Sequence, residues 1–232
     1  PAGLAALSKA RNAVIVGDDK QIGPIFEGWD KSTRQPPDNR FDVRAVSLLD
    51  SAKMLAASAP VPSTLLKEHY RCHPAIIEFC NRMYYNGQLI AMTDPSDAQE
   101  PPMRVVRAAP GNHARRLRGG RYSQREIDII AQLEDLRLLD HGVTTEDKDE
   151  SGDYVLGIVT PYREQANRVG ARVRQESEGS GHARWLAETA HKFQGRGAGT
   201  IVFSTVLNSD DTDGGDPRFY DDSRITNVAV SR

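Results

Sequence analysis

The sequence has 232 residues and a formal net charge of −2 at pH 7, and 27% of its residues are charged while 38% are hydrophobic. This is the composition of a soluble globular domain, so it excludes a wholly disordered chain and a protein that holds nucleic acid through an overall basic charge. No apolar run approaches the ~18 residues of a membrane span, and at roughly 100–200 residues per domain the length fits one domain, or one domain with part of another.

The first part of the chain is expected to contain one buried strand and one helix. Residues 12–16 form a short apolar run rich in β-branched residues, and the turn formers at 17–19 end it. Such a run predicts a buried parallel strand, whose polar end lies where α/β sheets hold ligands. Residues 28–42 are polar with two consecutive prolines, so we expect a loop there. Helical spacing returns over 43–58, and we place a domain boundary near residue 59.

The remainder alternates predicted helices with predicted strands. Apolar residues at helical spacing predict helices over 75–85, 123–140 and 163–176. Short runs of β-branched residues predict strands over 155–159, 200–206 and 225–230. Asn86 and Gly87 form a stop signal for the first of these helices. The alternation predicts βαβ units, and hence an α/β fold with a mostly parallel sheet.

Residues 103–125 contain seven arginines and no acidic residue. A stretch of this charge could be a loop that contacts phosphates. The alternative is a mobile, solvated loop beside Gly119 and Gly120, and we favour that alternative.

The two cysteines, Cys72 and Cys80, are too few for a disulfide framework. Because the start of the chain also lacks the apolar core of a signal peptide, we expect a reducing, cytoplasmic setting. Together with His69 and His73 the cysteines do not match the ligand spacing of a structural zinc site. We therefore expect them to pack in a core, and we assign no metal ligand.

Five polar clusters follow one another along the chain. They are GDDKQIGP at 17–24, EHYRCHP with FCNRMYYNG over 68–87, VTPYREQ at 159–165, TAHKFQGR at 189–196 and NVAVSR at 227–232. In this order they resemble motifs III, IV, Va, V and VI of superfamily 1 helicases. The closest branch contains the RNA helicase of nonsense-mediated decay and its bacterial relatives. Each cluster alone is modest evidence, but the five in order make the resemblance specific.

The resemblance implies a RecA-like fold, a parallel sheet flanked by helices. Residues 59–232 would be the second RecA-like motor domain, and residues 1–58 the tail of the first, including the linker. The parent protein would be a helicase that uses ATP and Mg²⁺ and moves 5′→3′ on single-stranded DNA or RNA. The sequence has no GxxGxGK[ST] phosphate loop and no DExx box on a predicted strand. We therefore expect the rest of the first RecA-like domain upstream, and no ATP hydrolysis by this chain alone.

The resemblance also implies roles for individual residues. Arg71 and Arg232 match two arginine fingers, a role that suits guanidinium groups because they bind phosphate oxygens with paired hydrogen bonds. Gln21 matches the glutamine that senses the γ-phosphate and orients the attacking water. The residues implied at the nucleotide and its metal shell are Asp18, Gln194 and Gly195. The residues implied at the nucleic-acid strand are Thr160, Tyr162 and Thr189, although Tyr162 also suits a packing role.

The sequence departs from the family pattern at two positions. A glutamate that follows the FQG segment in the family is Gly197 here, and a glutamine before the YR pair is His69. The first departure keeps an alternative open, namely a nucleic-acid-binding scaffold with a degenerate motor. His73, which precedes Pro74, is assigned to helix entry.

Overall fold

The computed structural model describes residues 7–23, 38–42, 46–58, 61–97, 101–111, 113–117, 120–133, 154–180, 185–207 and 222–231. The chain divides into two units, Pro1–Leu66 and Lys67–Arg232, and each is described by itself. The division follows Leu66, whereas we placed the domain boundary near residue 59, and the assignment of 1–58 and 59–232 to two motor domains stays a prediction.

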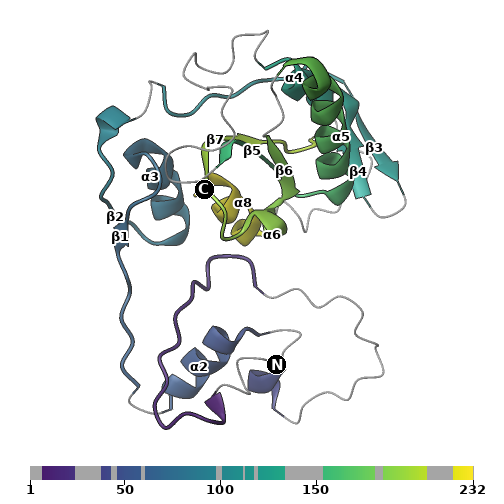
Figure 1. Ribbon diagram of the computed structural model, residues 1–232. Helices are drawn as coiled ribbons and strands as arrows, with labels where there is room; N and C mark the ends of the chain where they lie inside the picture. Colours follow the sequence, from purple (N-terminus) through teal and green to yellow (C-terminus); the bar gives the residue numbers. More distant parts are fainter. Residues whose placement is uncertain are drawn as a thin grey trace. The chain divides into compact units, whose positions relative to one another are not determined.

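The second unit is built on a parallel sheet of three strands in the order β6-β5-β7 (Figure 1). These strands are β5 (Tyr154–Thr160), β6 (Leu186–Thr189) and β7 (Ala198–Phe203). The predicted strands at 155–159 and 200–206 are thereby confirmed as β5 and β7, while β6 was not predicted. Because β5 lies between the other two strands and is covered on both faces, it reads as a continuous apolar run.

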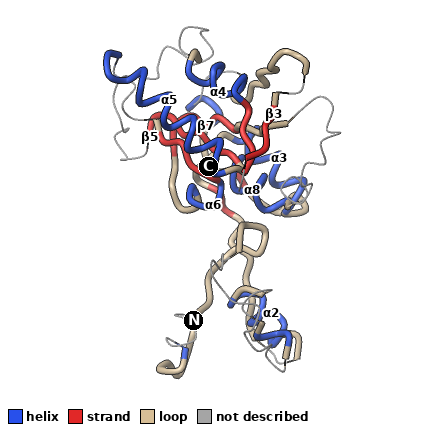
Figure 2. The backbone as a smooth tube through the Cα atoms, turned by 90° about the vertical axis from the view of Figure 1, so that its right-hand side faces the viewer, coloured by secondary structure: helices blue, strands red, loops and turns tan. Residues whose placement is uncertain are grey.

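Helices cover both faces of this sheet (Figures 1 and 2). On one face, α4 (Gln124–Ala131) and α5 (Arg163–Ser180) pack on alternate residues of β5. The buried residues of that layer are Ile127, Ile130, Leu133, Leu156, Ile158, Val169 and Val173. On the opposite face Gly157 lies against Phe193 of α6 (Ala190–Phe193). The mixed α/β architecture with a parallel sheet and flanking helices is therefore confirmed.

The strand predicted over 225–230 is wrong, because these residues form helix α8 (Ser223–Val230). Ile225, Val228 and Ala229 are buried at spacings of three and four residues, which is the period of one helix face. Asp222 caps the helix by accepting a hydrogen bond from the backbone nitrogen of Arg224 at 3.0 Å. The β-branched composition suggested a strand, but the helical period and the cap decide the structure.

Helix α3 (Pro74–Tyr84) follows a short parallel pair of strands, β1 (Glu68–His69) and β2 (Ile90–Ala91). The predicted stop at Asn86 and Gly87 is confirmed, since both residues have positive φ, 53° and 71°. The backbone nitrogen of Gly87 donates to the carbonyl oxygen of Asn81 at 3.0 Å, which closes the end of the helix. A 3₁₀ turn, η2 (Pro95–Asp97), comes after β2.

The arginine-rich stretch contains an antiparallel hairpin of β3 (Ala114–Leu117) and β4 (Gly120–Ser123). The expectation of a solvated loop is therefore wrong for these residues. The predicted helix over 123–140 is found as α4, and its part beyond residue 133 lies outside the described residues. Across the part of the chain that the structure describes, no helix has the length and apolarity needed to span a membrane.

The first unit contains helix α2 (Leu48–Ala56), which confirms a helix within 43–58. It begins at Leu48 because Ser47 and Asp50 form a capping box. The Ser47 hydroxyl accepts from the backbone nitrogen of Asp50 at 3.1 Å, and the Asp50 carboxylate accepts from the backbone nitrogen of Ser47 at 3.0 Å. Residues 43–45 of the predicted helix lie outside the described residues.

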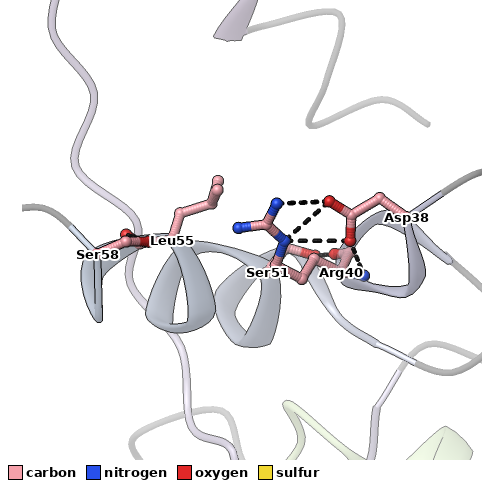
Figure 3. A network of polar contacts seen from close by, with 5 residues as sticks. All are labelled: Asp38, Arg40, Ser51, Leu55 and Ser58. Atoms are coloured by element: carbon pink, nitrogen blue, oxygen red, sulfur yellow. Dashed lines mark hydrogen bonds and ion pairs between the residues drawn. The ribbon is translucent and has the colours of Figure 1, made fainter.

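Polar contacts hold α2 to the 3₁₀ turn η1 (Asn39–Phe41) (Figure 3). The Ser51 hydroxyl donates to the carbonyl oxygen of Arg40 at 2.6 Å, and the Arg40 guanidinium pairs with the Asp38 carboxylate at 2.6 Å. At the other end of α2, the Ser58 hydroxyl donates to the carbonyl oxygen of Leu55 at 3.1 Å. Helix α2 buries none of its residues, and the bond from Ser51 to Arg40 is the contact of this group that joins it to η1.

The buried strand predicted over 12–16 is wrong. These residues form no strand, and Val14 and Val16 are 90% and 78% exposed. A parallel strand is stable only when neighbouring strands satisfy its backbone groups, and none of the described residues of Pro1–Leu66 forms a strand. Residues 12–16 therefore have the composition of a strand, but the described residues of this unit offer no neighbouring strand for them to pair with.

Candidate functional site

The turn that follows residues 12–16 brings two predicted site residues together. The Asp18 carboxylate accepts from the side-chain nitrogen of Gln21 and from the backbone nitrogen of Lys20, both at 2.9 Å. The first of these bonds orients the Gln21 amide, and the second holds the Asp18 carboxylate. The neighbouring Asp19 pairs with Lys53 of α2 at 3.0 Å. Burial alone would raise the pKa of Asp19, but the hydrogen bond and charge of Lys53 outweigh it and lower that pKa.

Arg71 lies in the turn between β1 and α3, and its side chain is exposed. The residue after it is held on both sides, since the backbone nitrogen of Cys72 donates to the His69 ring at 3.0 Å and the Thr93 hydroxyl donates to the carbonyl oxygen of Cys72 at 2.6 Å. His69, the departure from the family glutamine, thus supports this turn. The structure holds the backbone beside Arg71 in place while its guanidinium faces solvent.

His73 begins α3, as predicted. Its ring Nδ1 accepts from the backbone nitrogen of Ala75 at 3.2 Å, and its Nε2 lies 3.1 Å from the carbonyl oxygen of Pro95. Because Nδ1 accepts, Nε2 carries the proton that bonds Pro95. The imidazole therefore joins the helix entry to η2.

The two cysteines lie in a core, as predicted. Cys72, Ile77 and Cys80 are buried together, and both thiols are free. Burial, and secondarily the neighbouring Cys72, raise the pKa of Cys80 to about 12. The Cys80 thiol therefore stays protonated at neutral pH and behaves as a small apolar side chain.

The segments that carry the two predicted arginine fingers pack against each other within the second unit. Val230, near the end of α8, packs on the core of Cys72 and its neighbours. The side-chain nitrogen of Asn227 donates to the Tyr85 hydroxyl at 2.8 Å, just beyond the end of α3. Arg232 itself lies outside the described residues. The structure thus brings the chain just before Arg232 beside the chain just after Arg71.

Two predicted strand-contacting residues are neighbours in the sheet. Thr160 and Thr189 are partners in the β5–β6 register at the carboxyl ends of these strands. The Thr160 hydroxyl is buried and lies 3.4 Å from the backbone nitrogen of Tyr162, which donates to it. Thr189 is half-buried at the start of α6, and its side chain does not cap that helix.

The third predicted strand-contacting residue, Tyr162, is buried. It packs with Ala114 of the hairpin and with Val206, which follows β7. Its ring holds the β5–α5 turn in place, which agrees with the packing role that the sequence left open.

Gln194 and Gly195 follow α6 and are exposed. Gly195 has a φ of 86°, and no atom lies within 4 Å of the place that a Cβ would occupy. Glycine adopts this backbone conformation without strain. Because the space beside Gly195 is open, a ligand could approach the main chain closely there. Gly197, which replaces the family glutamate, is buried.

A buried polar network at the sheet was not predicted. The Gln165 side chain accepts from the backbone nitrogen of Ser123 and donates to the Ser204 hydroxyl, both at 2.9 Å. Ser204 in turn donates to the Glu126 carboxylate at 2.6 Å. The same carboxylate oxygen accepts from the backbone nitrogen of Val206 at 3.1 Å. The network thus joins the starts of α4 and α5 to the end of β7.

The network stabilises an unusual backbone conformation. Val206 has a φ of 58°, a rare value for a β-branched residue that costs on the order of 1–3 kcal/mol. The hydrogen bond from Val206 to Glu126 offsets part of this cost. The spacing of Ser123 and Glu126, which is that of a capping box, is the only sequence feature that points to this network. In the structure, Gln165 takes the place of Glu126 as the acceptor for the Ser123 backbone nitrogen.

We expect this network to make stability depend on pH. Burial raises the pKa of Glu126 above its ordinary value of 4.5, although hydrogen bonds from Ser204, Val206 and Thr205 oppose the shift. The folded state therefore binds the proton more tightly than the unfolded state. The free energy of unfolding should fall as the pH rises from 4.5 to the raised native pKa.

Urea unfolding followed by circular dichroism between pH 4 and 8 measures this slope, and Glu126→Gln should flatten it. Glu78→Gln, which removes a charge from the surface of α3, controls for the change in net charge. A slope that is the same in the wild type and in Glu126→Gln would contradict the assignment.

The chain is similar in sequence to known proteins. The AAA domain family matches residues 45–232. The chain is 26% identical to the probable helicase with zinc finger domain of Danio rerio, over 99% of this chain and 12% of that protein. It is 24% identical to the RNA helicase Mov10l1 of Mus musculus, over 94% of this chain and 19% of that protein. It is 26% identical to the regulator of nonsense transcripts 1 homolog of Neurospora crassa, over 96% of this chain and 19% of that protein. The chain therefore spans between 12% and 19% of the length of these relatives.

Proposed function

This chain belongs to the AAA domain family, in the superfamily 1 helicase branch of the nonsense-mediated-decay helicase, and from this we propose that it is part of an ATP-dependent motor that moves 5′→3′ along single-stranded nucleic acid. The observation that carries the proposal is the packing of the Arg71 turn beside the end of α8. That packing supports two arginine side chains acting on one phosphate group. The proposed setting is the cytoplasm, because both cysteines are free.

The proposed chemistry is transfer of the γ-phosphoryl group of ATP to water, which depends on positioning and charge stabilisation rather than on covalent catalysis. Arg71 and Arg232 act as the fingers that stabilise the charge developing on the phosphate. Gln21, its amide oriented by Asp18, positions the attacking water. ATP would supply the phosphoryl group, Mg²⁺ would neutralise part of its charge, and Asp18 would support the metal and its waters.

Gln194 and Gly195 fit the nucleotide side of this site. The left-handed backbone at Gly195 and the open space beside it suit a main chain that a phosphate or a ribose approaches. We assign both residues to nucleotide binding, with the phosphate loop supplied by a longer protein that contains this chain. The chain alone is then inactive as an ATPase.

The strand of nucleic acid lies, in this proposal, at the carboxyl ends of β5 and β6. The Thr189 hydroxyl, which is half-buried and does not cap α6, donates to a backbone phosphate. Thr160 and Tyr162 are the more buried pair, and they set the shape of the turn against which the strand lies. Either DNA or RNA suits such contacts, because they address the backbone rather than the bases.

A second candidate function is a nucleic-acid-binding scaffold whose motor is degenerate. The observation that favours it is Gly197, a buried glycine in place of the family glutamate. A protein of this kind binds the strand but turns ATP over slowly or not at all.

Steady-state ATP hydrolysis by the longer protein, measured with and without single-stranded DNA and RNA, tests the proposal. We expect turnover that either polymer stimulates, and no turnover by the 232-residue chain under any of these conditions. Absence of hydrolysis in the longer protein, together with retained strand binding, would favour the scaffold.

A further inference from the structure

The β3–β4 hairpin concentrates positive charge on the second unit. It lies in the stretch 103–125, which has seven arginines and no acidic residue. Arg115 and Arg116 lie on β3 with exposed side chains, and Arg125 is exposed in the first turn of α4. Arg116 pairs in register with Arg121 across the hairpin, and Arg121 is buried. The exposed guanidinium groups of this stretch suit an anionic ligand.

Contacts with α5 and with the turn before it anchor the hairpin on the second unit. Ala114 packs on Tyr162, and the backbone nitrogen of Ser123 donates to Gln165 at 2.9 Å. Gly120 lies so close to α5 that an added Cβ would be 3.0 Å from Glu164. These contacts place the hairpin against the β5–α5 turn, which is the turn that begins with Thr160.

Aromatic stacking and an ion pair strengthen the attachment. The Arg168 guanidinium stacks 3.8 Å from the ring centroid of Tyr122, where it forms a cation–π contact. Arg168 also pairs with Glu164 at 2.6 Å. The Glu164 carboxylate is therefore paired within α5.

We propose that the β3–β4 hairpin is a phosphate-binding extension of the nucleic-acid surface, with Arg115 and Arg116 contacting the backbone of a single strand that also passes the Thr160–Thr189 edge. The inference rests on the proposed function, because it takes the strand to lie at that edge. Its chemistry is sequence-independent, since contacts from arginine side chains to phosphates carry no sequence information. The hairpin therefore adds affinity and salt dependence but no base preference.

Salt-dependent binding tests the inference without ATP. The longer protein is titrated against dye-labelled dT20 and U20 by fluorescence anisotropy at 50–200 mM salt. For single strands, the slope of log K against log salt changes by about 0.7 per phosphate contact. R115Q/R116Q should therefore reduce the slope by about 1.4 and weaken binding about 25-fold at 100 mM salt. Circular dichroism checks that the variant stays folded.

The matched control is R82Q/R174Q, which removes two exposed arginines of α3 and α5 outside the hairpin. It should leave the salt slope at the wild-type value. If the wild type binds and R115Q/R116Q keeps the wild-type slope, the inference is overturned while the proposed function stands. If the wild type binds neither oligonucleotide, both are overturned. Displacement of the strand by polyglutamate as effectively as by unlabelled dT20 would assign the hairpin to an acidic protein partner instead.

Discussion

Replacement of Arg71 by alanine in the longer protein is expected to abolish nucleic-acid-stimulated ATP hydrolysis with little change in ATP affinity. A finger of this type contributes on the order of 10³–10⁵ in kcat, because it acts on charge that develops only in the transition state. The Arg71 side chain is exposed, and the hydrogen bonds of His69 and Thr93 hold the adjacent backbone without it. The variant should therefore fold normally.

Steady-state kinetics with saturating single-stranded RNA or DNA, and binding of a fluorescent ATP analogue, separate the two quantities. Arg82→Ala is the matched control, because Arg82 is an exposed arginine of α3 that pairs with Glu78 at 2.5 Å. Arg71→Lys should recover little activity, since a lysine lacks the paired donors of a guanidinium. Wild-type turnover in Arg71→Ala would rule out the finger assignment.

Gly157→Ala is expected to destabilise the second unit strongly. A Cβ at this position in the middle of β5 would lie 2.5 Å from the Phe193 ring and 2.9 Å from the Ile201 side chain. Phe193 is fully buried, so its ring cannot move aside without repacking of its neighbours. Overpacking of this kind costs roughly 1–3 kcal/mol in the free energy of unfolding.

Urea denaturation measures this effect against a glycine of the same unit. Gly170 lies within α5, where an added Cβ would meet its nearest atom, in Arg174, at 3.5 Å. Gly170→Ala should therefore stabilise the unit by about 0.5–1 kcal/mol. The double variant Gly157→Ala/Phe193→Leu should recover part of the loss. Equal stability of Gly157→Ala and the wild type would show that the sheet and α6 do not pack as described.

The fold could be predicted where local pattern and tertiary environment agree. Strand β5 is buried on both faces, so residues 155–159 form an apolar run, and the end of α3 requires the positive φ that Asn86 and Gly87 supply. Prediction failed where composition and period conflict. Helix α8 is rich in β-branched residues, yet its buried positions follow the helical period. Residues 12–16 have the composition of a strand but no sheet beside them.

The candidate site could be predicted only as far as its residues lie within contiguous clusters. The register of Thr160 with Thr189 agrees with a shared edge, because parallel strands end on the same side of a sheet. The Glu126–Ser204–Gln165 network could not be predicted, since Ser204 is 78 residues from Glu126 and 39 from Gln165. Nothing in the local pattern around any one of them indicates that a buried hydroxyl will join them.

Helix α6 has a mechanical consequence for such a motor. Helix α6 separates Thr189 from Gln194, which lies five residues further along the chain, so the proposed strand contact and the proposed nucleotide contact are about 7.5 Å apart along the helix axis. Ala190 and Phe193, the ends of this single turn, are completely buried. Because both ends of this turn are packed in the core, we expect α6 to move as one unit in such a motor. The proposed nucleotide contact and the proposed strand contact would then move together, because only this one short helix separates them.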